Sequence, residues 1–402
     1  MRPFTSTISL DEARRRLDAN VHPIDRAERV RLEEAGGRVA ATDVTSSIDV
    51  PPFARSMMDG YAVAAADTDS ASKTSPVRLR LLDRIYTGTM PSVTVERGAC
   101  AEIATGAPMP AGSDAVVMVE ETATADNERI DVFAVVKAGQ NVGDRGADIR
   151  VGDRVVSYGH VLTPSRIGAV AAIGCADVEV FAKPRVAILS TGNEVVAPGQ
   201  PLGPGQIFDV NRLTLGAIVS AHGGVAEFLR PAQDTVEALR HALDESAHAD
   251  LIVFSGGSSV GERDLIVDAI ATRGETIFHG IAVRPGKPTL FARVGGTPFF
   301  GMPGNPTSCL SNAYILLIPF LRALARLPPH APRTVRAPLG RRIASAVNRH
   351  QFYTVRLQDG VAFPAFKGSG DITSLSQADG YIEIAADTSV VEEGITVDVT
   401  LF

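Results

Sequence analysis

The sequence predicts a multidomain α/β plus β protein in which a doubly wound α/β domain is flanked by smaller β-rich regions. Its 402 residues are more than one hydrophobic core usually holds. After Pro184, apolar runs of strand length alternate with amphipathic helical stretches, which is typical of a parallel doubly wound sheet. On either side of this region, short β-rich runs are broken by Pro and Gly.

Local periodicity predicts each element of the α/β region. Strands are expected at 186–189, 225–229 and 251–254, and helices at 210–221 and 235–246. The apolar residues of 210–221 lie on one helical face, as packing against a sheet requires. A further helix is expected from Thr307, because Asn305 suits its N-cap and Pro306 its first position.

The flanking regions are predicted to be mostly β. Residues 77–82 and 130–135 are β-rich, and the proline-rich stretch 328–332 precedes short β runs that end at 395–401. Residues 139–182 contain a helix after Pro164. We expect this segment to pack with an N-terminal helix that Ser9 and Glu12 open as a capping box.

Composition argues against several classes of protein. A formal charge of −7 and a pI near 5.7 give no general attraction to nucleic acid or anionic lipid. The three cysteines are far apart and suggest neither a disulfide framework nor a zinc site. The start lacks a signal peptide's apolar core, and the most apolar stretch, Ala313 to Leu327, is shorter than the roughly 20 residues that span a bilayer. We therefore expect a cytoplasmic protein with no nucleic acid or membrane partner.

Loops rich in Gly, Ser, Thr and acids are candidates for a binding site. They cover residues 190–194, 255–264, 284–288 and 301–306. Ligands of open parallel sheets bind beyond the carboxyl ends of the strands, where these loops are expected. A single helix N-terminus stabilises a bound anion by only about 0.3–1 kcal/mol, so a phosphate-bearing ligand needs several such loops to converge.

One familiar motif is matched and another nearly matched in these loops, and we reject both functions. Ser259 lies in a G-x-S-x-G pattern, but no His-Gly-Gly-Gly segment occurs and Asp264 would oppose the oxyanion of a serine hydrolase. The 284–288 loop resembles the end of a Walker A motif, but position 281 is Ile and Pro288 replaces the metal-binding hydroxyl.

Acidic residues among the loops suggest a divalent cation. Glu194, Asp234 and Asp264 each lie at or just after a predicted strand end. A carboxylate repels a phosphate unless a cation lies between them, and Mg²⁺ prefers one or two carboxylates together with phosphate oxygens. The alternative for each acid is a helix cap or a solvated side chain, and Asp234 in particular suits the cap of the helix from Thr235.

On these motifs the sequence closely resembles the molybdopterin molybdenumtransferase family, which completes molybdenum cofactor synthesis. The matching stretches are 51–62, 105–110, 190–194, 255–264, 284–288 and 301–306. The resemblance implies a homodimer with active sites between subunits, and four domains in each chain. These are a helical linker domain (1–48 plus 139–182), an inserted β domain (49–138), the α/β molybdopterin-binding domain (183–327) and a C-terminal β-barrel (333–402).

The reaction that the resemblance implies inserts molybdate into adenylylated molybdopterin, with Mg²⁺-dependent cleavage of the phosphoanhydride and release of AMP. A transient contact with the adenylyltransferase of the pathway is also implied. Two alternatives stay open, a non-catalytic pterin-binding or scaffolding paralogue and an enzyme that inserts tungstate. The acids Asp59, Glu194 and Asp264 favour an enzyme, because a scaffold has no need of them.

The resemblance also assigns roles to individual residues. The implied catalytic residues are Asp59, Glu194, Asp264 and Lys287. The implied metal ligands are Glu194, Asp234 and Asp264. The residues implied to bind the substrate oxyanion are Arg284, Lys287, Pro303, Pro306 and Ser374. The residues implied to bind the pterin and its adenylate are Thr105, Thr191, Gly192, Ser255, Gly256, Gly257, Ser258, Ser259, Gly261, Gly286, Gly304, Asn305 and Ser369. Gly143 stands where the family usually has an arginine, a contact that Arg145 could replace.

Overall fold

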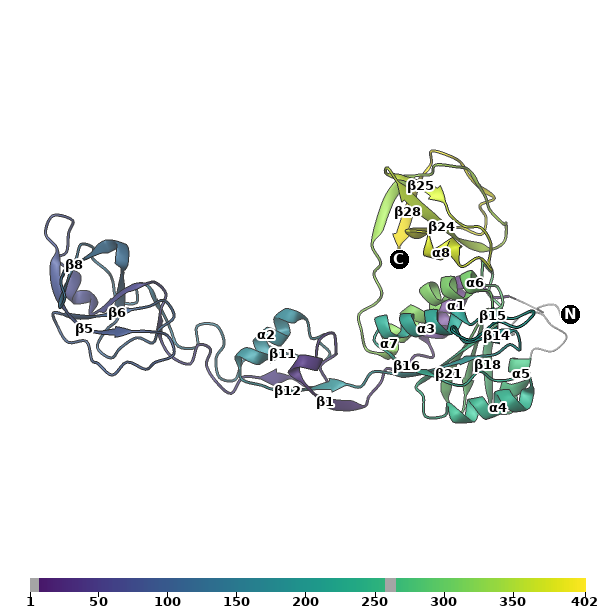
Figure 1. Ribbon diagram of the computed structural model, residues 1–402, viewed down its shortest axis with the longest axis horizontal. Coiled ribbons are helices and arrows are strands. Elements are labelled where there is room, and N and C mark those ends of the chain that lie inside the picture. Colours follow the sequence, from purple (N-terminus) through teal and green to yellow (C-terminus); the bar gives the residue numbers. More distant parts are fainter. Residues whose placement is uncertain (1–6, 257–264) are drawn as a thin grey trace. The chain divides into compact units, whose positions relative to one another are not determined.

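The computed structural model describes residues 7–256 and 265–402 (Figure 1). The chain divides into two compact units. The first comprises Met1–Glu28, Gly37–Val39 and Phe181–Phe402, and the second comprises Arg29–Gly36 and Ala40–Val180.

A six-stranded sheet forms the centre of the first unit. Its order is β16 (Val225–Phe228), β13 (Arg185–Ser190), β17 (Leu251–Ser255), β21 (Thr297–Met302), β20 (Leu290–Val294) and β18 (Gly274–His279). The first four strands run parallel, as predicted. At the other edge, for which no strands were predicted, β20 is antiparallel to β21 and β18, so the sheet is mixed. Gly295 and Gly296, with φ of 57° and 89°, form a two-residue hairpin turn that reverses the chain there.

Helices cover both faces of this sheet (Figure 1). One face packs against α3 (Val210–Ala221), α6 (Pro306–Asn312), a π-helical turn (Ala313–Leu317) and α7 (Ile318–Leu324). The other packs against α4 (Val236–Glu245) and α5 (Leu265–Ile270). Because α3 follows β13 on one face and α5 follows β17 on the other, a switch point lies between these two neighbouring strands. Open sheets bind ligands at such a point.

The run Pro306–Leu324 is the one helical stretch of the described residues that is long and apolar enough to cross a membrane. Of the 18 consecutive residues of this run that are most apolar, 72% are buried inside the fold. This is typical of the core helix of a globular domain. The stretch is longer than expected from the sequence because the helix begins at Pro306 and continues through the π-helical turn.

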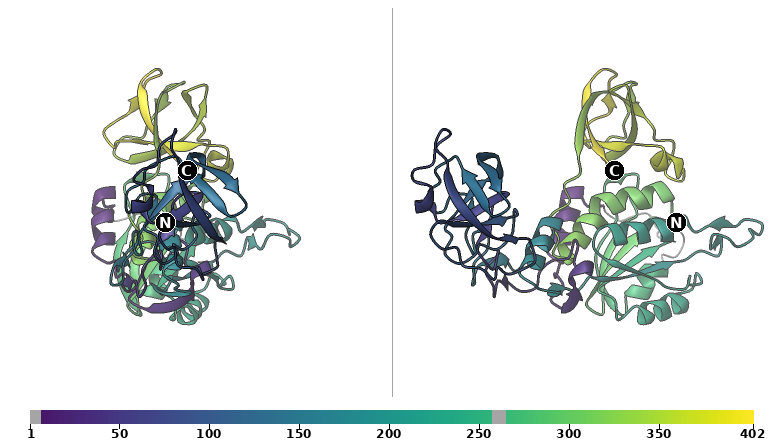
Figure 2. Two further views of the ribbon diagram at one scale, coloured as in Figure 1. Left: turned by 90° about the vertical axis from the view of Figure 1, so that its left-hand side faces the viewer. Right: turned by 60° about the vertical axis from the view of Figure 1, so that its left-hand side comes forward.

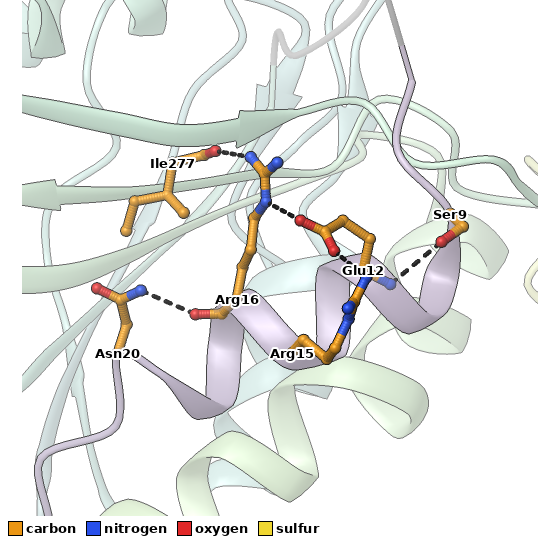
Figure 3. A network of polar contacts seen from close by, with 6 residues as sticks. All are labelled: Ser9, Glu12, Arg15, Arg16, Asn20 and Ile277. Atoms are coloured by element: carbon orange, nitrogen blue, oxygen red, sulfur yellow. Dashed lines mark hydrogen bonds and ion pairs between the residues drawn. The ribbon is translucent and has the colours of Figure 1, made fainter.

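The N-terminal helix α1 (Leu10–Asp18) belongs to the first unit. We expected it to pack with residues 139–182, but Leu10, Ala13 and Leu17 lie in the core beneath the α/β sheet. Figure 3 shows the polar contact that accompanies this packing, in which Arg16 Nη1 donates to Ile277 O of β18 at 2.8 Å. Sequence periodicity predicts a helix but does not identify its distant partner.

The capping box at the start of α1 is half formed (Figure 3). Ser9 Oγ accepts from Glu12 N at 3.1 Å, as predicted. The Glu12 carboxylate pairs with Arg16 and Arg15 instead of returning to the backbone of Ser9. The hydrogen bond from Arg16 is the largest influence that lowers the pKa of Glu12.

The C-terminal β domain follows within the same unit. Its main sheet contains β24 (His350–Gln358), β26 (Gly380–Ile384), β28 (Thr396–Leu401) and β22 (Thr334–Pro338), with β25 (Val361–Pro364) paired to β24. Beside it lie β23 (Ile343–Ala344), β27 (Val390–Val391) and α8 (Thr373–Ser376). The short strand β19 (Val283–Arg284), from the α/β region, pairs in parallel with β24. This pairing ties the 284–288 loop to the C-terminal domain.

The second unit contains a six-stranded sheet and a smaller helical part. The sheet comprises β7 (Ala115–Met118), β4 (Gly60–Val63), β6 (Ala99–Ile103), β5 (Val77–Ile85), β9 (Arg129–Val132) and β8 (Thr122–Asp126). A separate small core surrounds α2 (Pro164–Ala172). The remaining short strands are β1 (Ala27–Arg31), β2 (Val44–Thr45), β3 (Arg55–Ser56), β10 (Val142–Gly143), β11 (Arg154–Val156) and β12 (Asp177–Phe181).

Two histidines join the proline-rich linker to the α/β domain. The His330 ring meets His222 at the end of α3 edge to face, with centroids 5.1 Å apart. Arg322 Nε donates to Pro328 O at 2.8 Å. Burial, followed by the nearby His330 and Arg322, lowers the pKa of His222 to about 4 from its ordinary 6.5.

This shift predicts a pH dependence of stability. Between pH 6.5 and about 4 the unfolded chain protonates His222 while the folded protein resists, so the free energy of unfolding falls as the pH drops through this window. We expect His222→Gln to lose less stability than wild type between pH 7 and pH 4.5. Urea unfolding at both pH values measures this, and equal losses in the two proteins would contradict it.

Candidate functional site

A cavity of about 1030 Å³ opens in the first unit at the carboxyl ends of β13, β17 and β21. Its wall includes residues that follow each of these strands, the 283–288 loop and the start of α6. The C-terminal domain completes it with Arg349 and residues of the 366–372 segment. The cavity therefore lies at the switch point between β13 and β17, where the topology predicts a ligand.

The two strand ends approach closely at this point. Ser190 and Ser255 are register partners, and Thr191 N donates to Ser255 O at 3.1 Å. Gly256 follows with φ of +149°, and a Cβ there would lie 2.5 Å from Thr191 Oγ1. Only glycine fits both this backbone conformation and this spacing.

A projecting loop holds two carboxylates at its base. Strands β14 (Val195–Val196) and β15 (Ile207–Phe208) pair in parallel, and the chain between them extends from the α/β domain in both views of Figure 2. Ile207 N donates to Glu194 O at 2.7 Å, and Asp209 N donates to Val196 O at 2.8 Å. Glu194 and Asp209 both line the cavity.

Cationic side chains are in excess along the described wall. Arg284 ends the short strand β19 and Lys287 follows it, whereas Arg349 and Lys367 come from the C-terminal domain. Glu194 and Asp209 are the two carboxylates of the described lining. A wall of this charge favours an anionic ligand.

A buried asparagine holds the loop that carries Arg284 and Lys287. Asn312 Nδ2, on α6, donates to Gly286 O at 2.8 Å and contacts Thr289 Oγ1. Thr289 Oγ1 donates to the same carbonyl at 2.9 Å. Gly286 has φ of +102°, and a Cβ there would lie 2.2 Å from Asn312 Nδ2. The loop therefore depends on glycine at position 286.

Hydrogen bonds link the start of α6 to the C-terminal domain. Asn305 Nδ2 donates to Ser369 Oγ at 3.1 Å, and Thr307 Oγ1 donates to Asp371 O at 2.8 Å. Asn305 occupies the N-cap position as predicted, but its side chain makes no capping bond. It is engaged with Ser369 instead, so both domains contribute to one continuous wall.

Comparison with known proteins agrees with this architecture. Three family models match successive parts of the chain: the MoeA N-terminal region (domain I and II) at 8–174, the probable molybdopterin binding domain at 187–323 and the MoeA C-terminal region (domain IV) at 336–402. The molybdopterin molybdenumtransferase of Haemophilus influenzae is 31% identical over 98% of both chains. This chain belongs to the molybdopterin molybdenumtransferase family. It is accordingly a transferase of molybdenum cofactor biosynthesis.

Other relatives support the same assignment. The molybdopterin molybdenumtransferase of a Nostoc species is 37% identical over 75% of this chain and 70% of its own. The solved structure of the molybdopterin biosynthesis moea protein from Pyrococcus horikosii is 39% identical, with a TM-score of 0.85 over 98% of this chain and 99% of that one. The family and the multidomain fold predicted from the sequence are confirmed.

The cavity brings together many of the residues that the family resemblance singled out. Those that line it are Thr191, Glu194, Ser255, Gly256, Arg284, Gly286, Lys287, Pro303, Gly304, Asn305, Pro306 and Ser369. Gly257, Ser258, Ser259, Gly261 and Asp264 lie outside the described residues. Their roles stay predictions.

Three other predicted residues do not line the cavity. Gly192 lies under Glu194, and Asp234 is exposed just before α4. The cap of α4 is Thr235, whose Oγ1 accepts from Ala238 N, and not Asp234. Ser374 is fully buried and its Oγ accepts from Lys367 N at 2.9 Å. In this structure Ser374 therefore shapes the 367–370 loop and does not reach the cavity.

The predicted residues of the second unit form their own contact. Asp59 Oδ1 accepts from Thr105 N at 2.7 Å, so the two loops that carry them meet. Arg145 Nε donates to Asp49 Oδ2 at 2.7 Å. Arg145, which we considered as a replacement for the family arginine absent at Gly143, therefore forms an ion pair with Asp49 in this structure.

Sequence reasoning gave no site role to several polar residues of the cavity, among them two near the start of α3 and two in the C-terminal domain. Asn211 lay within the predicted helix 210–221 and Asp209 directly before it, although their types suit a binding site. Arg349 and Lys367 reach the cavity from another domain, and no local pattern signals such an approach. A polar side chain beside glycine or a helix start, as at Lys367, Asp209 and Asn211, is too frequent in sequences to identify a site.

Proposed function

We propose that the enzyme binds adenylylated molybdopterin and molybdate, cleaves the phosphoanhydride and releases AMP as the metal enters the dithiolene. The observation that carries this proposal is a single large cavity at the switch point that combines Arg284, Lys287, Arg349 and Lys367 with two carboxylates. Such a lining suits a ligand with several anionic groups and one part that needs acidic contacts. It also suits a second, smaller anion at the same site.

The 284–288 loop is the proposed oxyanion site. Arg284 and Lys287 supply positive charge, and Gly286, which Asn312 holds, fixes the loop between them. Pro303 and Pro306 also line the cavity and present apolar surface that limits water around the anion. We assign the incoming molybdate to this end, since a tetrahedral dianion needs charge more than directional contacts.

Mg²⁺ or a similar cation is proposed at Glu194. A Cβ at Gly192 would lie 2.7 Å from Glu194 Oε2, so glycine there leaves room for the carboxylate. Among the described residues no three His, Cys, Asp or Glu side chains gather closely enough to hold a metal. This fits Mg²⁺, which takes few carboxylates and completes its shell with phosphate and water. When bound it would neutralise charge on the anhydride, with Asp264 as the further proposed ligand; Asp234, which lies exposed outside the cavity, is the weaker of the predicted ligands.

The remaining proposals concern assembly and location. We propose a homodimer in which the Asp59 and Thr105 loops approach the cavity of the partner subunit, a transient contact with the adenylyltransferase of the pathway, and a cytoplasmic location. The hydrogen bond between these two loops supports a shared role. Analytical ultracentrifugation tests the dimer, and mixed dimers of Asp59→Asn with Lys287→Ala test whether active sites are shared.

Release of AMP tests the proposed reaction. With adenylylated molybdopterin and Mg²⁺, we expect AMP to appear only when molybdate is added, and a parallel titration with tungstate gives the oxyanion preference. Tight binding of the pterin without release of AMP would instead support a scaffolding protein. Gln233→Asn, which changes no charge and lies outside the cavity, is the control. It should release AMP as wild type does, which verifies that the labile substrate is intact.

A further inference from the structure

Three polar atoms in the cavity have no hydrogen-bond partner among the residues that the structure describes. They are Ser190 Oγ, Asp209 Oδ2 and Asn211 Oδ1. All three residues line the cavity, and their exposed fractions are 3%, 6% and 7%. Burial of a polar atom without a partner is unfavourable, above all for a carboxylate. Three such atoms around one cavity therefore indicate a ligand that supplies their partners.

The surrounding hydrogen bonds determine which kind of partner is missing. Asn211 Nδ2 donates to Ser255 Oγ at 2.9 Å and to Gly304 O at 2.7 Å. A backbone carbonyl only accepts, so the amide orientation is fixed and Oδ1 is left as an acceptor. Asp209 Oδ1 accepts from Arg212 N at 3.0 Å, which leaves Oδ2 as a second acceptor. The partners missing at Asp209 and Asn211 are therefore N–H or O–H donors, or a cation, while the Ser190 hydroxyl can either donate or accept.

Only one part of the proposed substrate presents such donors in a suitable arrangement. Phosphate, dithiolene and molybdate groups are anionic, and Asp209 would repel them. A ribose diol also presents two donors, but it lacks the flat face that would cover the apolar surface of Ile207 and Phe208 beside Asp209. The pyrimidine ring of a pterin carries an amino group beside a ring N–H, which are two adjacent donors on one flat edge.

We propose that Asp209, Asn211 and Ser190 bind the N–H edge of the pterin ring and so orient the substrate in the cavity. This inference rests on the proposed function, because it requires a pterin substrate. Ile207 and Phe208 precede Asp209 and also line the cavity, where they offer apolar surface to a flat ring. With the pterin edge bound here, the anionic end of the substrate is directed toward the cationic side chains of the wall.

Equilibrium binding to the full chain tests this assignment with four separate probes: 6-hydroxymethylpterin, lumazine, AMP and Mg²⁺. Lumazine has an oxygen in place of the pterin amino group. Asp209→Asn keeps a residue suited to the N-cap of α3 but replaces an acceptor with a donor. We expect it to weaken pterin binding about 10- to 100-fold, as loss of a hydrogen bond to a charged group does. Lumazine and AMP should bind both proteins alike.

A second variant and a matched control keep the test decisive. Ser190→Ala removes one hydrogen-bonding hydroxyl without adding bulk, and we expect a several-fold loss of pterin affinity. Asp268→Asn makes the same chemical change on the exposed surface of α5, outside the cavity, and should leave every affinity unchanged. Thermal unfolding of each variant verifies that it is folded.

The outcomes separate this inference from the proposed function. If wild type binds the pterin and both variants bind it equally well, the assignment of Asp209 and Ser190 is wrong while the proposed function stands. If wild type binds no pterin, the proposed function itself is contradicted. If Asp209→Asn weakens binding of Mg²⁺ or AMP but not of the pterin, the three atoms serve a cation or the nucleotide, and the inference is also overturned.

Discussion

Gly286→Ala is expected to lower molybdate-dependent turnover by about 100-fold or more, because it displaces the loop that carries Arg284 and Lys287. The new Cβ would lie 2.2 Å from Asn312 Nδ2, and the φ of +102° disfavours any side chain. Backbone strain of about 1–3 kcal/mol and overpacking of about 1–3 kcal/mol should together lower the free energy of unfolding. A shift of roughly 1 Å in such a loop accounts for the activity loss.

Gly295→Ala is the matched control for this change. Gly295 also has a positive φ, of +57°, but a Cβ there meets nothing within 4 Å, and the residue lies in the β20–β21 turn outside the cavity. We expect a small loss of stability and normal turnover. Urea unfolding and initial rates of AMP release measure both variants. Wild-type turnover in Gly286→Ala would mean that Asn312 and Gly286 do not determine the position of the oxyanion loop.

Glu194→Gln is expected to lower the rate of AMP release by about 100-fold or more and to raise the Mg²⁺ concentration needed for half-maximal activity. The substitution keeps the size of the side chain above Gly192 but removes the charge that would hold the cation. A cation at a developing phosphate charge contributes several kcal/mol to catalysis, which corresponds to this loss of rate. Titration of initial rates with Mg²⁺ measures both quantities.

Glu237→Gln makes the same chemical change in the same domain but on the exposed first turn of α4, away from the cavity. It should retain wild-type rates and Mg²⁺ dependence. A Glu194→Gln enzyme whose Mg²⁺ titration matches that of wild type would exclude Glu194 as a metal ligand. Attention would then move to the acids Asp234 and Asp264.

The parallel part of the α/β domain was predictable because its pattern is local. Leu251 and Val253 face one core and Ile252 and Phe254 face the other, so a short fully apolar run between turn residues indicates a strand covered on both sides. The antiparallel edge depends on how the turn at Gly295 reverses the chain. Such a turn is visible in the sequence, but its consequence for strand order is not.

The placement of the first helix could not be predicted for a similar reason. Ser9 and the spacing of Leu10, Ala13 and Leu17 indicate where an amphipathic helix begins and which face is apolar. The partner of that face is more than 200 residues away in the sequence, and Arg16 meets β18 through a backbone carbonyl that any residue could supply. Long-range packing of this kind leaves no trace in a local pattern.

The candidate site was predictable where its residues occur in glycine-rich loops at strand ends. Gly256 and Gly286 are examples, since a positive φ and a close neighbour exclude other residues there. Asp209 and Asn211 were missed because the start of a helix explains them equally well. Only the structure, which leaves one buried oxygen of each without a partner among the described residues, gives them a different role.

The most direct test of the account is the ratio of transferred molybdenum to released AMP in a single turnover. The enzyme is mixed with adenylylated molybdopterin, Mg²⁺ and molybdate, and the pterin product is separated and analysed for molybdenum while AMP is measured in the same sample. We expect one molybdenum atom in the pterin for each AMP released. Two results would contradict the coupling of AMP release to molybdenum insertion. One is release of AMP at an equal rate without molybdate, and the other is release of AMP while the pterin product contains no molybdenum.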